Sequence, residues 1–249
     1  MAHMVSHTVS ERAAESRARI LDAALKEFSA HGLAGARTES IARLAGVNKA
    51  LLYYYFDSKE NLYQAALDVI GARMRDETLA TLQRPCSAGE RVLRASLNHF
   101  DRILSQADFQ SLMQQEMMRL HNGEPGAMSV IVERVFAPMT RAYQVTVEEG
   151  IESGELIPVD WLQIHLSSMG TNVFYFLSAP VFRLMLRNEP LDCEVLRARR
   201  KSNVEFLGLA IFTDRAHGAE IAARVLTDTP MPEVKLDRLF HWKKASEEG

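Results

Sequence analysis

Apolar residues recur every three or four positions along most of the chain, the spacing of one face of an α-helix. No alternating strand pattern and no internal repeat interrupts this spacing, so the sequence predicts an all-α protein. The predicted helices cover Ser10 to Gly32, 38–45, 49–55, about 58–83, 87–104, 108–121, 127–152, 160–179 and 192–212, with a weaker segment over 218–226.

Proline and cap residues refine these boundaries. Pro85 ends the helix that begins near Ser58, and Ser87 with Glu90 has the spacing of a capping box. Pro138 predicts a kink inside the long helix 127–152. Residues 165–182 contain no Asp, Glu, Lys or Arg. They include several polar residues and barely reach the length of a membrane span, so we interpret them as a helix buried by the core and by a partner subunit.

The stretch 38–59 is the most informative part of the chain. Thr38 is placed to cap a short helix whose apolar face is Ile41, Ala42 and Ala45. Gly46 follows, where a left-handed turn favours glycine, and Asn48 caps the next helix. A helix, a glycine turn and a second helix form the helix-turn-helix pattern, although helical hairpins without a DNA partner share it.

Residues 17 to about 64 resemble the N-terminal domain of the TetR (tetracycline-repressor-like) family. The resemblance rests on Arg19–Ala24, Glu27-Phe28, His31-Gly32, Thr38, Ile41-Ala42, Ala45-Gly46-Val47, Leu52–Phe56 and Ser58–Leu62. It covers about a fifth of the chain. It implies a homodimeric repressor that binds double-stranded DNA at a palindromic operator, with a variable C-terminal domain that senses a small molecule. The predicted division places the DNA-binding domain at 1–62 and the ligand-sensing and dimerisation domain at 63–249, linked by the helix over about 58–83.

Positions on the second helix of the motif predict its DNA contacts, because the N-terminal residues of a recognition helix enter the major groove. Asn48, Lys49, Ala50 and Leu51 lie at this end, with Lys49 reaching a guanine edge or a phosphate and Ala50 a thymine methyl. The family often has a hydroxyl residue where Leu51 stands here. The resemblance implies phosphate contacts from Thr38, Tyr53, Tyr54 and Lys59, to which Arg37 adds another, while Tyr55 is either a core residue or a phosphate contact.

Charge and composition narrow the functional classes. The net charge is -3, and residues 1–62 hold 8 Lys and Arg against 7 Asp and Glu, so DNA binding must rest on a local patch. The two cysteines, Cys86 and Cys193, have no His or Cys at ligand spacing, which argues against zinc. Two free thiols and the lack of an apolar leader segment at the polar start predict a cytoplasmic protein without membrane association, metal or cofactor.

Seven of the 11 methionines lie between residues 113 and 185, and flexible thioethers suit an adaptable apolar pocket. We expect a mostly apolar effector, although core packing explains any single apolar residue equally well. The candidate ligand-binding residues are Phe100, Met113, Met117, Phe136, Met139, Tyr143, His165, Met169, Asn172 and Phe176. The candidate dimer interface is Val204, Leu207, Leu209, Ile211 and Phe212, since these exceed the apolar face that one subunit needs. The run Arg197, Arg199, Arg200 and Lys201 is interpreted as a solvated face, with an anionic effector as the alternative.

Other classes of protein remain as alternatives. An enzyme would need a nucleophile and base, a metal set or a phosphate loop, and the sequence has no HExxH, Walker or GxSxG motif. A DNA-binding regulator that answers to a protein partner, or one that activates transcription, shares the same N-terminal motif.

Overall fold

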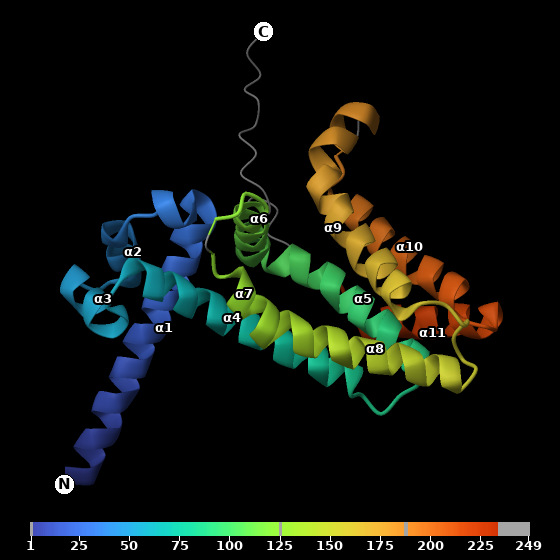
Figure 1. Ribbon diagram of the computed structural model, residues 1–249, viewed down its shortest axis with the longest axis horizontal. Helices are drawn as coiled ribbons and strands as arrows, with labels where there is room; N and C mark the ends of the chain where they lie inside the picture. Colours follow the sequence, from blue (N-terminus) through green and yellow to red (C-terminus); the bar gives the residue numbers. More distant parts are fainter. Residues whose placement is uncertain (1, 125, 187–188, 234–249) are drawn as a thin grey trace. The chain divides into compact units, whose positions relative to one another are not determined.

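The computed structural model describes residues 2–124, 126–186 and 189–233, and it confirms the all-α class (Figure 1). Apart from an isolated bridge between Leu156 and Phe212, the regular elements of these residues are helical. The helices are α1 (Ala2–Gly35), α2 (Thr38–Ala45), α3 (Lys49–Phe56), α4 (Lys59–Leu82), α5 (Ala88–Ser105), α6 (Ala107–His121), α7 (Met128–Ile131), the π-helix η1 (Val132–Phe136), α8 (Ala137–Glu152), α9 (Trp161–Leu186), α10 (Cys193–Ile211) and α11 (Arg215–Asp228).

The chain forms two compact units that interleave in sequence. The first contains Met1–Met74 and Asp108–Val135, and the second contains Arg75–Ala107 and Phe136–Gly249. This division differs from the predicted boundary after residue 62, because α6 belongs to the first unit. Ser29 on α1 hydrogen-bonds to Asp108 at 3.0 Å, and the Tyr63 hydroxyl on α4 donates to the buried Glu116 carboxylate at 2.7 Å. These contacts join segments far apart in sequence.

The core of the first unit forms where α1, α2, α3 and the start of α4 bury their apolar faces. Its fully buried side chains include Ile20, Phe28, Ile41, Leu52 and Leu62. Gly46 joins α2 to α3 with φ 66° and ψ 37°, a left-handed conformation in which a side chain would be strained. The Val47 N–H donates to the Ala42 carbonyl at 3.0 Å and closes the end of α2, as the sequence predicts.

The second unit is built around α5, which packs against α8, α9, α10 and α11. Val92, Leu93 and Leu97 of α5 share one core cluster with residues of the other four helices. The sequence predicted only a weak last segment, whereas α11 is a full helix that buries Ile221, Ala222 and Val225. A helix whose apolar residues are separated by charged ones gives a weak periodic signal, although tertiary packing stabilises it.

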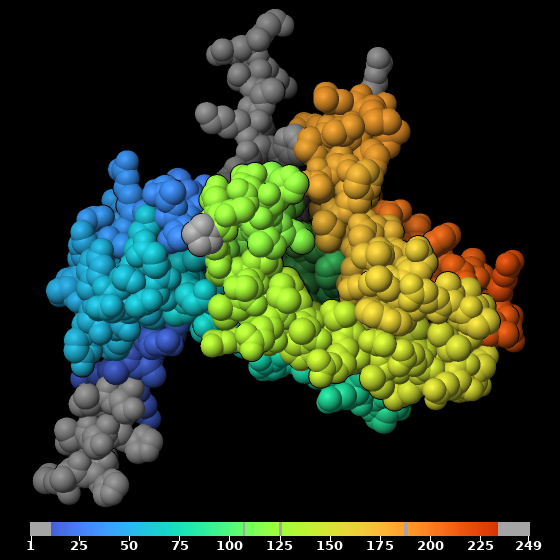
Figure 2. Space-filling model, viewed as in Figure 1, coloured from blue at the N-terminus to red at the C-terminus, as the bar shows by residue number. Residues whose placement is uncertain are grey.

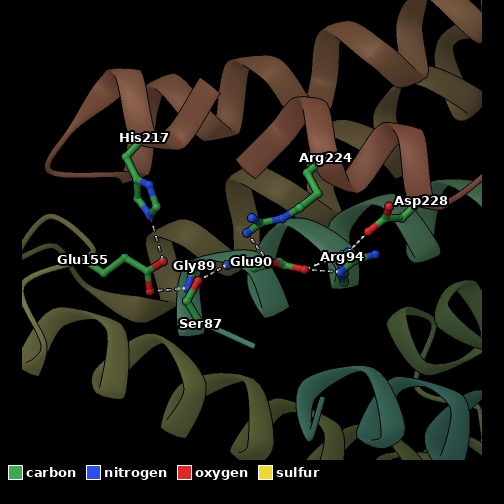
Figure 3. A network of polar contacts seen from close by, with 8 residues as sticks. All are labelled: Ser87, Gly89, Glu90, Arg94, Glu155, His217, Arg224 and Asp228. Carbon is green, nitrogen blue, oxygen red and sulfur yellow. Dashed lines mark hydrogen bonds and ion pairs between the residues drawn. The ribbon is translucent and has the colours of Figure 1, made fainter. Parts of the chain in front are cut away.

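Charged residues tie the start of α5 to α11 (Figure 3). The Ser87 hydroxyl caps α5 as predicted, by accepting from the Glu90 N–H. The Glu90 carboxylate accepts from Arg94 at 2.8 Å and from Arg224 at 2.6 Å, and Arg94 also contacts Asp228 at 2.6 Å. Burial alone would raise the pKa of Glu90, but these two arginines lower it below its ordinary value. The network therefore keeps Glu90 ionised and joins residues 134 positions apart.

Two glycines allow α10 and α11 to approach closely. A Cβ on Gly218 would lie 2.0 Å from the Gly208 carbonyl oxygen, and a Cβ on Gly208 would lie 2.6 Å from that of Gly218. We expect Gly218→Ala to lower the free energy of unfolding by about 1–3 kcal/mol, because the two backbones must separate. Chemical denaturation would measure the change. Gly35→Ala is the control, since a Cβ there would make only an ordinary contact, 3.5 Å from the His31 Cβ, and equal effects of the two substitutions would contradict the prediction.

Prolines act differently at their two helical positions. Pro138 lies in the first turn of α8, directly after the π-helix η1, so the predicted long helix is divided at this point as expected. Val132 in η1 is exposed, although its spacing from Met128 and Val135 predicts a place on the buried face of the helix. Pro180 lies inside α9, which continues to Leu186 instead of ending near Ala179. Among the described residues no helix is both long and apolar enough to cross a membrane.

Candidate functional site

The start of α2 is held by a buried carboxylate of α1. Glu27 accepts from the backbone N–H of Arg37 at 3.0 Å and from the Ser40 hydroxyl at 2.8 Å. Burial alone would raise its pKa, but these hydrogen bonds and the nearby positive charges lower the pKa of Glu27. The predicted cap by Thr38 is wrong: α2 has no side-chain cap of its own, and Glu27 supplies the acceptor from another helix.

α3 has one buried face and one exposed face. Leu52 and Phe56 are buried against the core, whereas Tyr54 is 81% exposed. Lys49, Ala50 and Tyr53 are also exposed, and Leu51 and Tyr55 are half-buried. Asn48 caps the helix as predicted, because its side-chain oxygen accepts from the Leu51 N–H at 2.7 Å. The exposed residues therefore project from a rigid helix with a fixed start.

Two residues in the first turn of α2 contact the exposed side chains of Lys49 and Tyr53, which lie one turn apart on α3. Thr38 is buried, and its hydroxyl lies 3.3 Å from the Tyr53 hydroxyl. The Lys49 ammonium pairs with the Glu39 carboxylate and lies 5.8 Å from the centre of the Tyr53 ring. The hydrogen bond between them raises the pKa of Lys49 and lowers that of Glu39, so both groups carry full charge near neutral pH.

Two further cations border this surface. Arg37 is exposed immediately before α2. Lys59 is half-buried at the start of α4 and donates to the Ala34 carbonyl at 3.2 Å. Arg19, which the sequence analysis did not assign to this surface, donates to the Ala45 carbonyl at 3.3 Å and fixes the end of α2. Glu27 and Arg19 lie in the motif that carries the family resemblance. That motif is the sequence signal by which their structural roles could have been found.

The candidate ligand-binding residues divide between the two units. In the second unit, Phe100 and Phe176 pack with ring centres 5.1 Å apart, and the Tyr143 and His165 rings are 4.8 Å apart. Met169 packs against the main core cluster of this unit, and Phe136 and Met139 are half-buried. Met113 and Met117 instead lie on α6 in the first unit, where Met113 is buried and Met117 is exposed. The predicted set is therefore not one cluster.

A buried polar cluster accompanies these aromatic residues of the second unit. Asn172 donates to the Ser96 carbonyl at 3.1 Å and contacts the His99 ring at 3.2 Å, and it accepts from Asn203 at 2.6 Å. Burial lowers the pKa of His99 to about 3, assisted by the positive charge of Arg102, so this ring is neutral. The sequence pattern did not single out Ser96 or Asn203, because neither belongs to a recognisable motif.

Five buried polar atoms among the described residues have no hydrogen-bond partner, and all lie in the second unit: Arg91 Nε, Ser96 Oγ, Gln106 Oε1, Glu155 Oε1 and His165 Nδ1. Of these, the Ser96 and His165 atoms belong to residues that contact the candidate ligand residues Asn172 and Tyr143. Burial lowers the pKa of His165, so this ring is also held towards its neutral form. An unsatisfied buried polar group costs free energy, and a bound ligand is one way to supply the missing partner.

The predicted dimer interface is corrected by the burial of its residues. Val204, Leu207, Ile211 and Phe212 pack in the core cluster of the second unit, and of the predicted set only Leu209 is exposed. These four are therefore core residues of one chain, covered mainly by α5 and α11. The sequence gives only a weak helical signal for α11, so the apolar face of α10 has no evident intramolecular partner in the sequence alone.

Helix α9, drawn in yellow to orange on the face shown in Figure 2, carries most of the exposed large apolar residues of the second unit. These residues recur at helical spacing and are all exposed: Leu162, Leu166, Phe174, Leu177, Val181 and Leu184. Gly170 lies in the same row with open space around it. Phe206 and Leu209 add an exposed apolar pair on α10. A continuous apolar stripe of this length is typical of a protein–protein interface.

The arginine run at the start of α10 is not uniformly solvated. Arg200 is buried and forms two hydrogen bonds to Asp101, each 2.7 Å long. Arg197 and Lys201 pair with Glu194 and Glu205 on the same helix, and Arg199 stacks over the Tyr175 ring at 5.2 Å. The interpretation as a solvated face is therefore wrong for Arg200, which is a core ion pair.

The all-helical fold and the exposed side of α3 define a helix-turn-helix protein whose recognition helix is available to duplex DNA. Residues 20–66 match the family described as bacterial regulatory proteins, tetR family, and residues 89–207 match the tetracycline-repressor-like C-terminal domain. The chain belongs to the TetR family of DNA-binding transcriptional regulators, which are not enzymes.

Individual relatives are similar over different lengths. The HTH-type transcriptional repressor NicS of Pseudomonas putida is 29% identical over 68% of this chain and 79% of its own length. The regulator RutR of Escherichia coli K12 is 60% identical over 48 residues, which are 19% of this chain and 23% of RutR. The chain thus spans most of NicS, whereas its similarity to RutR is confined to a short segment.

Solved structures share the fold at low sequence identity. A gamma-butyrolactone receptor (ArpA-like protein) superposes with a TM-score of 0.60 and 21% identity, over 88% of this chain and 100% of that one. FadR from Bacillus subtilis in complex with stearoyl-CoA superposes with a TM-score of 0.57 and 18% identity, over 76% and 96%. At these identities the likeness establishes the fold alone.

Proposed function

We propose that this regulator is a homodimeric repressor that binds a palindromic operator and is released by a small, mostly apolar effector. The observation that carries the DNA-binding part is the two-sided α3, which buries Leu52 and Phe56 and leaves Lys49, Ala50, Tyr53 and Tyr54 exposed. A helix of this kind at the surface of a helix-turn-helix domain presents its side chains to the major groove.

The residues of this surface take distinct roles. Lys49 and Ala50 at the start of α3 read base edges, while Tyr53, Tyr54, Arg37 and Lys59 contact phosphates. Leu51 and Tyr55 are half-buried and contribute apolar contact at the margin. Thr38 is buried and positions the Tyr53 hydroxyl. Asn48 sets the start of the helix and leaves its side-chain amide N–H groups available to the backbone of DNA.

Two features support a dimer: the small number of base pairs that one recognition helix contacts, and the exposed apolar surface of α9. One recognition helix reads too few base pairs for specificity, and two related copies about one helical turn apart, roughly 34–36 Å, read a palindrome. The exposed apolar stripe of α9, with Phe206 and Leu209 of α10, supplies a surface that a second copy would bury.

The effector site is assigned to the second unit. Its aromatic residues Phe100 and Phe176 pack in one core cluster, and the Tyr143 ring packs against the His165 ring. The unpartnered Ser96 and His165 atoms favour an apolar ligand that also carries an uncharged hydrogen-bonding group. Among proteins of this fold, B. subtilis FadR was solved with stearoyl-CoA, a ligand with a long apolar chain.

Release of DNA would occur by a shift in population. A ligand that prefers a conformation with wrongly spaced recognition helices lowers operator affinity by the ratio of its affinities for the two conformations. The helix α4 is the element that carries this change, since it begins in the first unit at Lys59 and ends in the second at Leu82. A thermal-shift screen of apolar compounds followed by DNA release would test this part, and the absence of any hit would contradict it.

The DNA-binding proposal is tested by selecting duplexes from a random pool and measuring affinity by fluorescence anisotropy at several salt concentrations. We expect Lys49→Ala to weaken binding of the selected operator about tenfold, because a base-edge contact is lost. Its melting temperature should stay unchanged, since Lys49 is exposed. Lys26→Ala is the matched control, because Lys26 is equally exposed and pairs with Asp22 on α1. Unchanged affinity of Lys49→Ala at every salt concentration would place Lys49 outside the interface.

A further inference from the structure

Glu39 has no role in the proposed contacts, although it lies at the centre of the reading surface. It occupies the first turn of α2, and its side chain is 67% exposed. Its carboxylate forms a salt bridge with the Lys49 ammonium, the charged group at the start of α3. A donor and an acceptor are therefore held side by side where the first turns of the two helices meet.

A carboxylate at this position lowers the affinity for DNA in general. It repels the phosphates, and it offsets the charge of Lys49 on a surface whose domain carries almost no net positive charge. The pair is exposed, so it adds little to the stability of the fold. Glu39 also interacts favourably with the backbone in the first turn of α2, but the carboxylate that accepts from the Arg37 N–H and the Ser40 hydroxyl is Glu27. The exposed Glu39 carboxylate, paired with Lys49, is therefore placed to contact the major groove as well.

The major-groove edge of a G·C pair offers the complementary arrangement. Guanine presents the acceptors N7 and O6, and cytosine presents the donor N4, which is hydrogen-bonded to O6 in the base pair. We propose that Glu39 is a specificity-determining residue and that Lys49 and Glu39 together read one oriented G·C pair in each half-site. Lys49 donates to guanine O6 or N7, and Glu39 accepts from cytosine N4. This inference rests on the proposed operator binding.

The pair discriminates by repulsion as well as by attraction. A C·G pair in the opposite orientation would place the cytosine N4 donor against the Lys49 ammonium and the guanine acceptors against the Glu39 carboxylate. A T·A pair offers an acceptor and a donor in the right order, but its methyl group lies beside the ammonium and adenine N7 faces the carboxylate. An A·T pair would place the thymine O4 acceptor against the Glu39 carboxylate. The chemistry of the pair therefore favours G·C in a single orientation over the three other base pairs.

The experiment compares the wild-type protein, Glu39→Gln, Lys49→Met and Asp22→Asn by selection from a random duplex pool. Affinities are then measured for operators that carry each of the four base pairs at every position. We expect the wild type to prefer one oriented G·C pair in each half-site by at least tenfold. Glu39→Gln should relax this preference to threefold or less at that position alone, while it raises affinity for random duplex. Lys49→Met should abolish the preference and weaken binding.

The controls separate this inference from structural effects and from the proposed function. Asp22 and Lys26 on α1 form an ion pair with nearly the same exposure as Glu39 and Lys49, so Asp22→Asn should change neither preference nor melting temperature. An unchanged base preference of Glu39→Gln, or an equal loss of affinity for every sequence, would overturn the inference. Failure of the wild type to select any motif would instead overturn the proposed DNA binding.

Discussion

Replacement of Leu52 by alanine is expected to lower the free energy of unfolding of the first unit by about 2–5 kcal/mol and to abolish operator binding. Leu52 is fully buried, and it is the side chain that joins α3 to the core of the unit at its middle turn. Truncation leaves a cavity that the short α3 cannot fill by moving as a whole. Thermal unfolding and hydrogen exchange over residues 38–62 would measure the loss of protection.

Tyr54→Ala is the matched substitution on the opposite face of α3. Because Tyr54 is 81% exposed, we expect the free energy of unfolding of this variant to differ from the wild type by less than about 0.5 kcal/mol. Its affinity should fall for every operator sequence alike. The two variants together separate folding of the recognition helix from contact with DNA. If Leu52→Ala kept its hydrogen-exchange protection, the assignment of the buried face would be wrong.

Leu177→Arg is expected to convert the dimer to a monomer and to weaken operator binding by at least a hundredfold. Leu177 lies in the middle of the exposed apolar stripe of α9, where a buried arginine would lack a counter-charge among the stripe residues. A dimer gains affinity because the second recognition helix binds at a high effective concentration once the first has bound, a gain of roughly 10²–10⁴. Sedimentation or gel filtration at micromolar concentration would follow the oligomeric state.

Val145→Arg serves as the control for this substitution. Val145 is an exposed apolar residue of α8 in the same unit, outside the α9 stripe, so a charge there should leave the dimer and the operator affinity intact. A wild-type protein that remains monomeric at micromolar concentration would contradict the dimer proposal. A dimer that survives Leu177→Arg would place the interface on another surface.

Local signals in the sequence were sufficient for most helices and for part of the reading surface. Asn48 and Ser87 cap the helices that the pattern assigned to them, and Gly46 adopts the left-handed turn. Each of these features depends on residues within one or two helical turns. The exposed side of α3 followed only in part, because the pattern placed Leu52 inward but left Tyr55 open between core and surface. The structure buries Phe56 and leaves Tyr55 half-buried.

The errors arose wherever a distant segment decides the outcome. Glu27, and not Thr38, holds the start of α2. It lies on α1, ten residues before the Arg37 N–H from which it accepts. Val204, Leu207 and Ile211 look like a surplus apolar face until α11 covers them. Met113 and Met117 seemed to belong with Tyr143 and Phe176, but α6 packs in the first unit.

The sequence by itself thus determined that this protein is helical and that it has a helix-turn-helix whose second helix begins at Lys49, because periodicity, caps and a glycine turn are short-range properties. Only the tertiary structure decided which apolar faces are covered within one chain and which remain for a partner. It alone showed the ion pair of Glu39 with Lys49. Packing and ion pairing between separate helices depend on how those helices meet in space. The spacing of residues along one helix does not specify which helix lies beside it.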